Sequence, residues 1–146
     1  MGLKEIQEEI VANMKRWQKI ENASSASTGA IIEKTDNPVI RLIMEVIQRD
    51  SQFHYRVQEM IADSLESKAI TVSPDEIADV WDLIEKHINL EKETVKIAEA
   101  SLKATEGKKG LVVQRYLLEY LLKDEEKHNS VLDNLEGIKK GMYPYG

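Results

Sequence analysis

The chain has 146 residues with 20 Lys and Arg, 26 Asp and Glu and no Cys, and its formal net charge is −6. Its length fits one domain with a sizeable core, and the lack of Cys excludes disulfides, iron–sulfur clusters and Cys-based zinc sites. The acidic balance argues against a nucleic-acid partner, which needs a basic face. No apolar run approaches the roughly 20 residues that span a bilayer, and the first ten residues lack the apolar core of a signal peptide. We therefore expect a cytoplasmic protein with no nucleic-acid or membrane partner.

Long helices are predicted throughout the chain because it contains only 7 Gly and 3 Pro. Pro38 and Pro74 each occupy a first-turn position after a residue that suits an N-cap, Asn37 and Ser73. Between the breaks, apolar residues recur at spacings of three and four, which is the helical period. These patterns predict four helices, over residues 3–33, 38–65, 74–104 and 111–138.

The apolar stripes predict how these helices pack. No single helix can bury such a stripe alone, so the simplest fold is an all-α four-helix bundle over residues 1–138, followed by a C-terminal tail over 139–146. Trp17 and Trp81 lie on the stripes, and we expect both to pack in the core.

Ionisable residues interrupt the stripe of every helix near its middle. A buried carboxylate without a partner costs several kcal/mol, so a layer of them needs compensation. Either pairing with His or Lys or a bound cation would provide it. His87, one turn before Glu91, adds a third histidine near this layer. The interrupting residues are Glu21, Asp50, His54, Glu91, Glu125 and His128.

A short internal repeat connects the second and fourth predicted helices. Residues 49–54 and 123–128 both read as a basic residue, Asp, three variable positions and His. Apolar residues follow at matching offsets. The chain therefore resembles two successive helical hairpins, each ending in a helix that carries a His.

With Glu21, His54, Glu91 and the run 125–128, the chain resembles the ferritin-like superfamily, most closely its rubrerythrin-like branch. Those di-metal proteins take one Glu from each of two helices and a Glu-x-x-His from each of the other two. The resemblance implies a dinuclear iron centre, with manganese or zinc as alternatives, that oxidises ferrous iron or reduces dioxygen or peroxide. The implied metal ligands are Glu21, Asp50, His54, Glu91, Glu125 and His128.

One position departs from the family pattern. The residue three before His54 is Ser51, where the pattern has Glu. Asp50 is four before His54 and shares its helix face, so we expect Asp50 to act as the sixth ligand. Asp is shorter than Glu, which changes its reach.

The resemblance also implies a crossover between the second and third helices. If the second helix continued to Glu66 and the third began at Pro74, the crossover would have to span roughly 43 Å. Residues 67–73 reach only about 25 Å when fully extended. We therefore expect the second helix to end early, near Ile61 or Leu65, and residues 70–72 to be extended.

Other functions are compatible with the same residues. The bundle could be free of metal, with Glu–His pairs in its core, or could store metal without turnover, and in either case could act as an interaction module. A monomer and a homodimer both fit the narrow apolar stripes.

Overall fold

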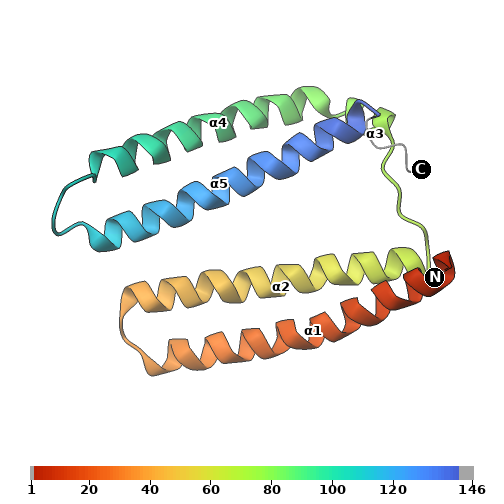
Figure 1. Ribbon diagram of the computed structural model, residues 1–146, viewed down its shortest axis with the longest axis horizontal. Helices are drawn as coiled ribbons and strands as arrows, with labels where there is room; N and C mark the ends of the chain where they lie inside the picture. The colour runs from red at the N-terminus through yellow and green to blue at the C-terminus, as the bar shows by residue number, and fades with distance from the viewer. Residues whose placement is uncertain (1, 142–146) are drawn as a thin grey trace. The chain divides into compact units, whose positions relative to one another are not determined.

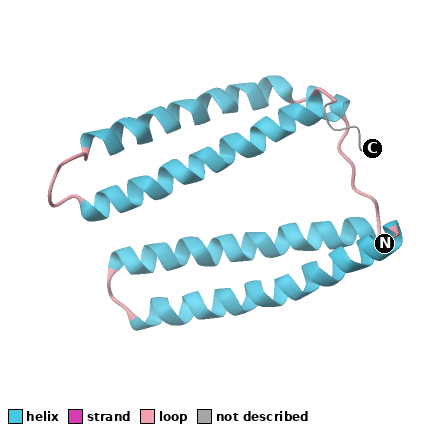
Figure 2. Cartoon of the chain, viewed as in Figure 1, coloured by secondary structure: helices cyan, strands magenta, loops and turns pink. Residues whose placement is uncertain are grey.

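The computed structural model describes residues 2–141, which are helical except for short connections (Figures 1 and 2). No strand occurs among these residues, which confirms the all-α prediction. No helix of this part of the chain combines the length and the hydropathy needed to cross a bilayer. Residues 142–146 of the predicted tail lie outside the described residues. The helices are α1 (Leu3–Lys34), α2 (Pro38–Glu66), α3 (Pro74–Ala78), α4 (Trp81–Ala104) and α5 (Val112–Lys139).

The chain divides into two compact units, one ending at Ile70 and the other beginning at Thr71. In the first unit α1 packs along α2, and we call this pair hairpin 1. In the second unit α4 packs along α5, with the short α3 also against α5, and we call these helices hairpin 2. The single bundle domain over residues 1–138 stays a prediction.

The predicted helix starts at Pro38 and Pro74 are confirmed, together with their caps. The Asn37 side chain accepts hydrogen bonds from the backbone N–H groups of Val39 and Ile40, at 3.0 and 3.1 Å. Ser73 accepts one from the N–H of Glu76 at 3.2 Å, while the Glu76 carboxylate accepts one from the N–H of Ser73 at 2.9 Å. These bonds satisfy backbone donors that have no partner inside the helix.

The third predicted helix is broken, which the sequence did not indicate. Asp79 and Val80 separate α3 from α4, and the N–H of Val80 bonds the carbonyl of Ile77, one residue short of the helical spacing. The tighter turn accompanies burial of Ile77 at the end of α3, which packs against α5. Because neither Gly nor Pro lies at this break, no local sequence signal predicts it.

α2 does not end early. It continues to Glu66, one residue beyond Leu65, and is capped by Ser67, so the prediction of an early end was wrong. Residues 70–72 lie outside any helix.

Small and polar side chains fill the contact between the helices of hairpin 1. The buried residues are Glu21 and Thr28 on α1 and Ser51, Gln58 and Ala62 on α2. A Cβ on Gly29 would lie 3.3 Å from the Gln48 amide nitrogen, which donates to the carbonyl of Ser25 at 3.0 Å. The absence of a side chain at Gly29 and the short side chains of Ser51 and Ala62 allow the helices to approach closely.

Large apolar side chains lie outside these contacts, contrary to the prediction for Trp17. Trp17 is 50% exposed, and Val57, Ile61 and Leu121 from the predicted stripes are exposed as well. Two packed helices have too little interior to cover the wide apolar faces of both. Trp81 is partly buried, as expected, and the Lys139 ammonium lies 4.7 Å from its ring centre.

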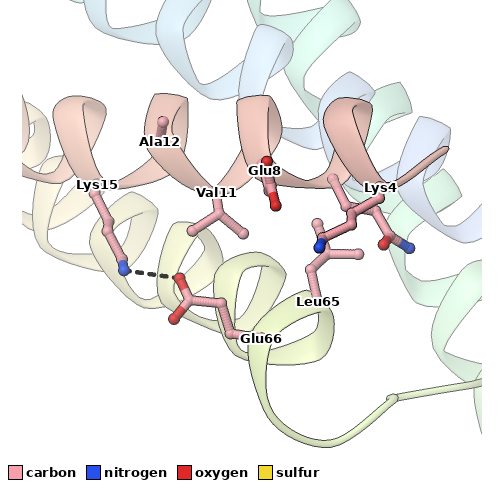
Figure 3. A pocket seen from close by; sticks show the side chains of 8 residues that line it. Lys4, Glu8, Val11, Ala12, Lys15, Leu65 and Glu66 are labelled. Atoms are coloured by element: carbon pink, nitrogen blue, oxygen red, sulfur yellow. Dashed lines mark ion pairs between the residues drawn. The ribbon is translucent and has the colours of Figure 1, made fainter. Parts of the chain in front are cut away.

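A shallow groove of about 500 Å³ lies in hairpin 1 between the start of α1 and the end of α2 (Figure 3). Val11, Ala12 and Leu65 supply its apolar lining. Its charges are mixed, and Lys15 pairs with Glu66 at 2.7 Å. With one ion pair across it and charges of both signs along its walls, the groove lacks the convergent polar groups that mark a ligand site.

Candidate metal site

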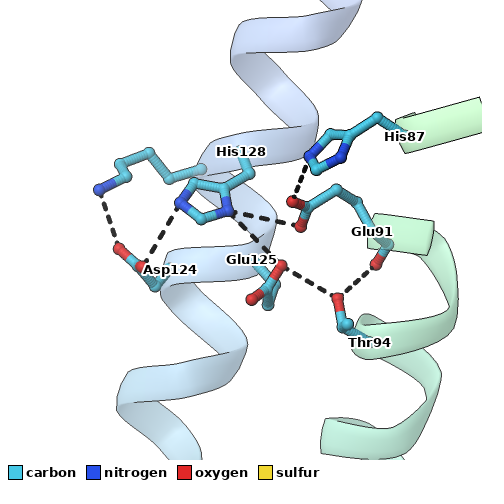
Figure 4. A network of polar contacts seen from close by, with 7 residues as sticks. His87, Glu91, Thr94, Asp124, Glu125 and His128 are labelled. Carbon is cyan, nitrogen blue, oxygen red and sulfur yellow. Dashed lines mark hydrogen bonds and ion pairs between the residues drawn. The ribbon is translucent and has the colours of Figure 1, made fainter. Parts of the chain in front are cut away.

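Glu91 of α4 and Glu125 and His128 of α5 converge in the middle of hairpin 2 (Figure 4). Each offers one potential ligand atom, and these atoms all lie within 4.8 Å of one another. Glu125 and His128 are three residues apart, so they share one face of α5. Glu91 is buried and the other two are partly buried. These three predicted ligands are therefore brought together as the Glu-x-x-His pattern implies.

The contacts of His128 in this cluster are longer than good hydrogen bonds, and their lengths also match the spacing of ligands around one metal ion. The Nδ1 atom of His128 lies 3.4 Å from Oε2 of Glu91 and 3.5 Å from Oε2 of Glu125. Good N–H···O bonds are about 2.7–3.2 Å long. Two ligand atoms each about 2.1 Å from a tetrahedral metal are roughly 3.4 Å apart. A divalent ion would thus fit among these atoms with small side-chain movements.

Glu91 is held in its ionised form by its neighbours. A hydrogen bond with the Glu125 carboxyl lowers the pKa of Glu91, and hydrogen bonds with His128 and His87 act in the same direction against the opposing effect of burial. The bond to His87 is short, with Nε2 2.8 Å from Oε1 of Glu91. Glu91 therefore supplies a carboxylate, the form that coordinates a cation.

Two further residues lie beside this cluster. Asp124 Oδ2 lies 3.5 Å from Nε2 of His128, on the opposite side of the ring from Glu91, and Asp124 Oδ1 lies 2.8 Å from the Lys127 ammonium. A carboxylate that hydrogen-bonds the second ring nitrogen of a metal-binding His fixes its tautomer, and at 3.5 Å a small movement of Asp124 would form that bond. The Thr94 hydroxyl lies 2.7 Å from the carbonyl of Glu91 and 3.0 Å from Oε2 of Glu125. It carries one proton and so donates to one of them at a time.

Hairpin 1 brings together only two of its three predicted ligands. His54 Nδ1 lies 3.5 Å from Oε1 of the buried Glu21. The Gln58 amide donates to the same Glu21 oxygen at 3.3 Å, and this leaves Oε1 of Gln58 buried without a hydrogen-bond partner among the described residues. The Gln58 amide and the His54 ring thus offset part of the cost of burying the Glu21 carboxylate, although both contacts are long for hydrogen bonds.

Asp50, the predicted sixth ligand, is exposed, and its side chain forms no hydrogen bond or ion pair within residues 2–141. The position that faces Glu21 is taken by its neighbour Ser51, which is buried and whose hydroxyl lies 2.9 Å from that of Ser24. Helix geometry explains the difference, because adjacent residues on a helix point about 100° apart. Hairpin 1 therefore places a hydroxyl where hairpin 2 has the Glu125 carboxylate.

The sequence indicated the ligand candidates but not the residues that support them. Asp124 was visible in the internal repeat as the counterpart of Asp50, four residues before a His, and that spacing could have identified its contact with His128. Thr94 lies three residues after Glu91 in no recognisable motif, so its contact depends on α5. No protein-family model, no curated protein and no solved structure matches the chain.

Proposed function

We propose that this protein binds a divalent transition-metal ion in hairpin 2 and uses it in redox chemistry. The observation that carries the proposal is the convergence of Glu91, Glu125 and His128. Two carboxylates and one imidazole suit iron, manganese or zinc, and no soft sulfur ligand is available to select copper(I). Of these metals, bound iron would exchange electrons with dioxygen or peroxide.

The residues around the cluster have definable parts in this function. Glu91 and Glu125 together carry two negative charges, which balance one divalent cation in a partly buried site. Asp124 lies beside Nε2 of His128, and Thr94 restrains the Glu125 carboxylate. Ligands held in place before metal binding lose less conformational freedom when the metal arrives.

The finer prediction of a ferritin-like four-helix bundle with a crossover belongs to the same proposal, and in such a bundle Glu21 and His54 would offer a second, weaker site beside the hairpin 2 cluster. The break at residues 79–80 supports it, because α4 begins only about 15 Å before Glu91, while α2 extends about 18 Å beyond His54. The crossover would then span roughly 33 Å instead of 43 Å. Residues 67–73 reach about 25 Å, and α3 with residues 79–80 adds at least another 10 Å. The chain is therefore long enough for the crossover even though α2 continues to Glu66.

Metal analysis of the full chain tests the binding. Protein purified without a chelator is analysed for its elements, and the metal-depleted protein is titrated with Fe²⁺ without oxygen and with Mn²⁺ and Zn²⁺. We expect at least one ion per chain and loss of binding in Glu91→Gln. The control is Glu93→Gln, which removes an exposed carboxylate from the same helix and leaves binding unchanged. Failure of all three metals to bind the wild-type chain would overturn the proposal.

An aerobic assay tests the redox part. The chain is mixed with Fe²⁺ and dioxygen, or with Fe²⁺ and peroxide, and the appearance of ferric iron is followed by absorbance. We expect oxidation faster than in buffer and in the Glu91→Gln variant. Metal binding without any acceleration would favour storage over turnover.

A second candidate, an interaction module, has one observation in its favour. Leu83, Leu90 and Ile97 recur every seven residues on α4, and each is well exposed within its hairpin. Exposed apolar stripes of this kind mark contacts between helices. Sedimentation of the chain before and after replacing Leu90 by Lys shows whether this stripe joins two copies. A monomer with and without the change would argue against self-association through it.

A further inference from the structure

The two hairpins offer unequal sets of metal-binding side chains. We propose that hairpin 2 alone holds the tightly bound ion and that His87 is its fourth protein ligand. This inference rests on the proposed metal-binding function and specifies its stoichiometry and its ligands. The predicted dinuclear centre would assign ligands from both hairpins to equal sites, whereas here a second ion binds more weakly or not at all.

Hairpin 1 lacks the charge to hold an ion tightly by itself. Its single buried carboxylate, Glu21, already accepts a hydrogen bond from Gln58. The Ser51 hydroxyl is engaged with Ser24, and Asp50 is exposed. Glu21 and His54 remain, and one carboxylate leaves half of a divalent charge uncompensated.

Hairpin 2 has two carboxylates and two histidines on adjoining helix turns. His87 is one turn before Glu91, and its Nε2 atom lies 2.8 Å from Oε1 of Glu91. The His87 side chain is 57% exposed, so its ring has room to turn from this hydrogen bond toward an ion bound by the Glu91 carboxylate. The other three ligand atoms already lie within 4.8 Å of one another.

The resulting set of two imidazoles and two carboxylates completes a four-coordinate site for Zn²⁺ or Co²⁺, whereas iron, which accepts up to six ligands, would keep positions open for dioxygen or peroxide. The charge of this set is neutral with one divalent cation, so no further carboxylate is required. Nitrogen and oxygen donors in tetrahedral arrangement suit Zn²⁺ and its spectroscopic substitute Co²⁺. Co²⁺ absorbs visible light more strongly when four-coordinate than when six-coordinate, so its spectrum reports the number of ligands.

The test is a Co²⁺ titration of the full chain, followed by visible absorption and calorimetry. We expect one tightly bound ion with an intense four-coordinate spectrum. His87→Asn should weaken the spectrum and reduce the affinity at least about tenfold. His54→Asn is the matched control, because the His54 side chain is also 57% exposed and pairs with a buried Glu. This control, alone or combined with Glu21→Gln, should leave the tight ion unchanged.

The outcomes separate the inference from the proposed function. Loss of the tight ion in the Glu21→Gln, His54→Asn double variant would overturn the inference and leave metal binding intact. An unchanged spectrum and affinity in His87→Asn would overturn the assignment of His87. Absence of Co²⁺ binding to the wild-type chain, together with the Fe²⁺, Mn²⁺ and Zn²⁺ results, would instead overturn the proposed function. Helix content by circular dichroism confirms that each variant is folded.

Discussion

Hairpin 1 and hairpin 2 use the same positions for different chemistry. Shifting Glu21 and Ser24 by 70 residues gives Glu91 and Thr94, and shifting Ser51 and His54 by 74 gives Glu125 and His128. In both hairpins a Glu from the first long helix meets a His from the last. In both, a hydroxyl from the first long helix also hydrogen-bonds the residue three before that His. In hairpin 1 this is the Ser24 hydroxyl with the Ser51 hydroxyl, and in hairpin 2 it is the Thr94 hydroxyl with the Glu125 carboxylate.

This difference lies at one position in each hairpin, Ser51 and Glu125. With Ser51, hairpin 1 has a partly buried pair of neutral hydroxyls between its two helices. With Glu125, hairpin 2 has a second, partly buried carboxylate, which adds repulsion unless a proton or a cation lies between the two. A hairpin designed only for stability would gain little from that carboxylate.

The largest expected effect is the loss of metal affinity when Glu125 of hairpin 2 is replaced. Glu125→Gln keeps the shape of the side chain but removes its charge, and we expect the affinity for Zn²⁺ or Co²⁺ to fall at least about 100-fold, measured by calorimetry. Loss of one charged contact of about 3 kcal/mol corresponds to such a factor. Glu126→Gln, the exposed neighbour, and Asp50→Asn, the counterpart of Asp124 in hairpin 1, should each change the affinity less than twofold. A fall for Asp50→Asn as large as that for Glu125→Gln would show that hairpin 1 takes part equally.

The next prediction converts hairpin 1 into the pattern of hairpin 2. Ser51→Glu creates Glu-x-x-His with His54, and we expect a second ion to bind, raising the stoichiometry from one to two. Without metal the larger buried side chain should destabilise the chain by about 1–3 kcal/mol in urea unfolding. Ser51→Gln has nearly the same volume without the charge, so metal should restore stability to Ser51→Glu only. If Ser51→Glu and Ser51→Gln showed the same metal stoichiometry and the same stability with metal, Ser51 would not correspond in function to Glu125.

Much of the fold was predictable because its signals are local. Asn37 and Ser73 cap helices through contacts within three residues, so the sequence alone specifies them. The break after α3 was not predictable, since neither Gly nor Pro marks it and α3 packs against α5, which is distant in sequence. Trp17 was predicted to be buried but is exposed in hairpin 1. A stripe of apolar residues shows which face of a helix is apolar but not which element covers that face.

The candidate site was predictable to the extent that it follows helix spacing. Glu125 and His128 share a face by their spacing of three, and Glu91 joined them through the repeat of the hairpins. The exposure of Asp50 was not predictable, because two positions, three and four before His54, both neighbour it on a helix. Only the packing of α1 against α2 shows that the third position before His54, Ser51, faces inward and that Asp50 faces outward.

A smaller effect is expected where the hairpins share an Asp but use it differently. Asp124→Asn removes the carboxylate beside Nε2 of His128, and such changes typically reduce metal affinity about 10–100-fold. We expect the lower end, because the 3.5 Å contact is long and Asp124 also pairs with Lys127. Calorimetry with Zn²⁺ measures the change. Asp124→Glu keeps the charge and should restore part of the affinity, whereas a purely structural role for Asp124 would give equal losses in both variants.

The smallest expected effect concerns the paired hydroxyls, Thr94 in hairpin 2 and Ser24 in hairpin 1. Thr94→Val preserves shape but removes the hydrogen bond to Glu125, so the carboxylate is less restrained before metal binds. A hydrogen bond of this kind contributes about 0.5–1.5 kcal/mol, which corresponds to a roughly two- to tenfold loss of affinity. Ser24→Ala removes the counterpart bond to Ser51, and it should reduce the free energy of unfolding by a similar amount while leaving metal affinity unchanged. Calorimetry and urea unfolding of both variants separate these effects. If Ser24→Ala weakened metal binding as much as Thr94→Val does, both hairpins would contribute to one metal site. The proposal that hairpin 2 alone holds the tight ion would then be wrong.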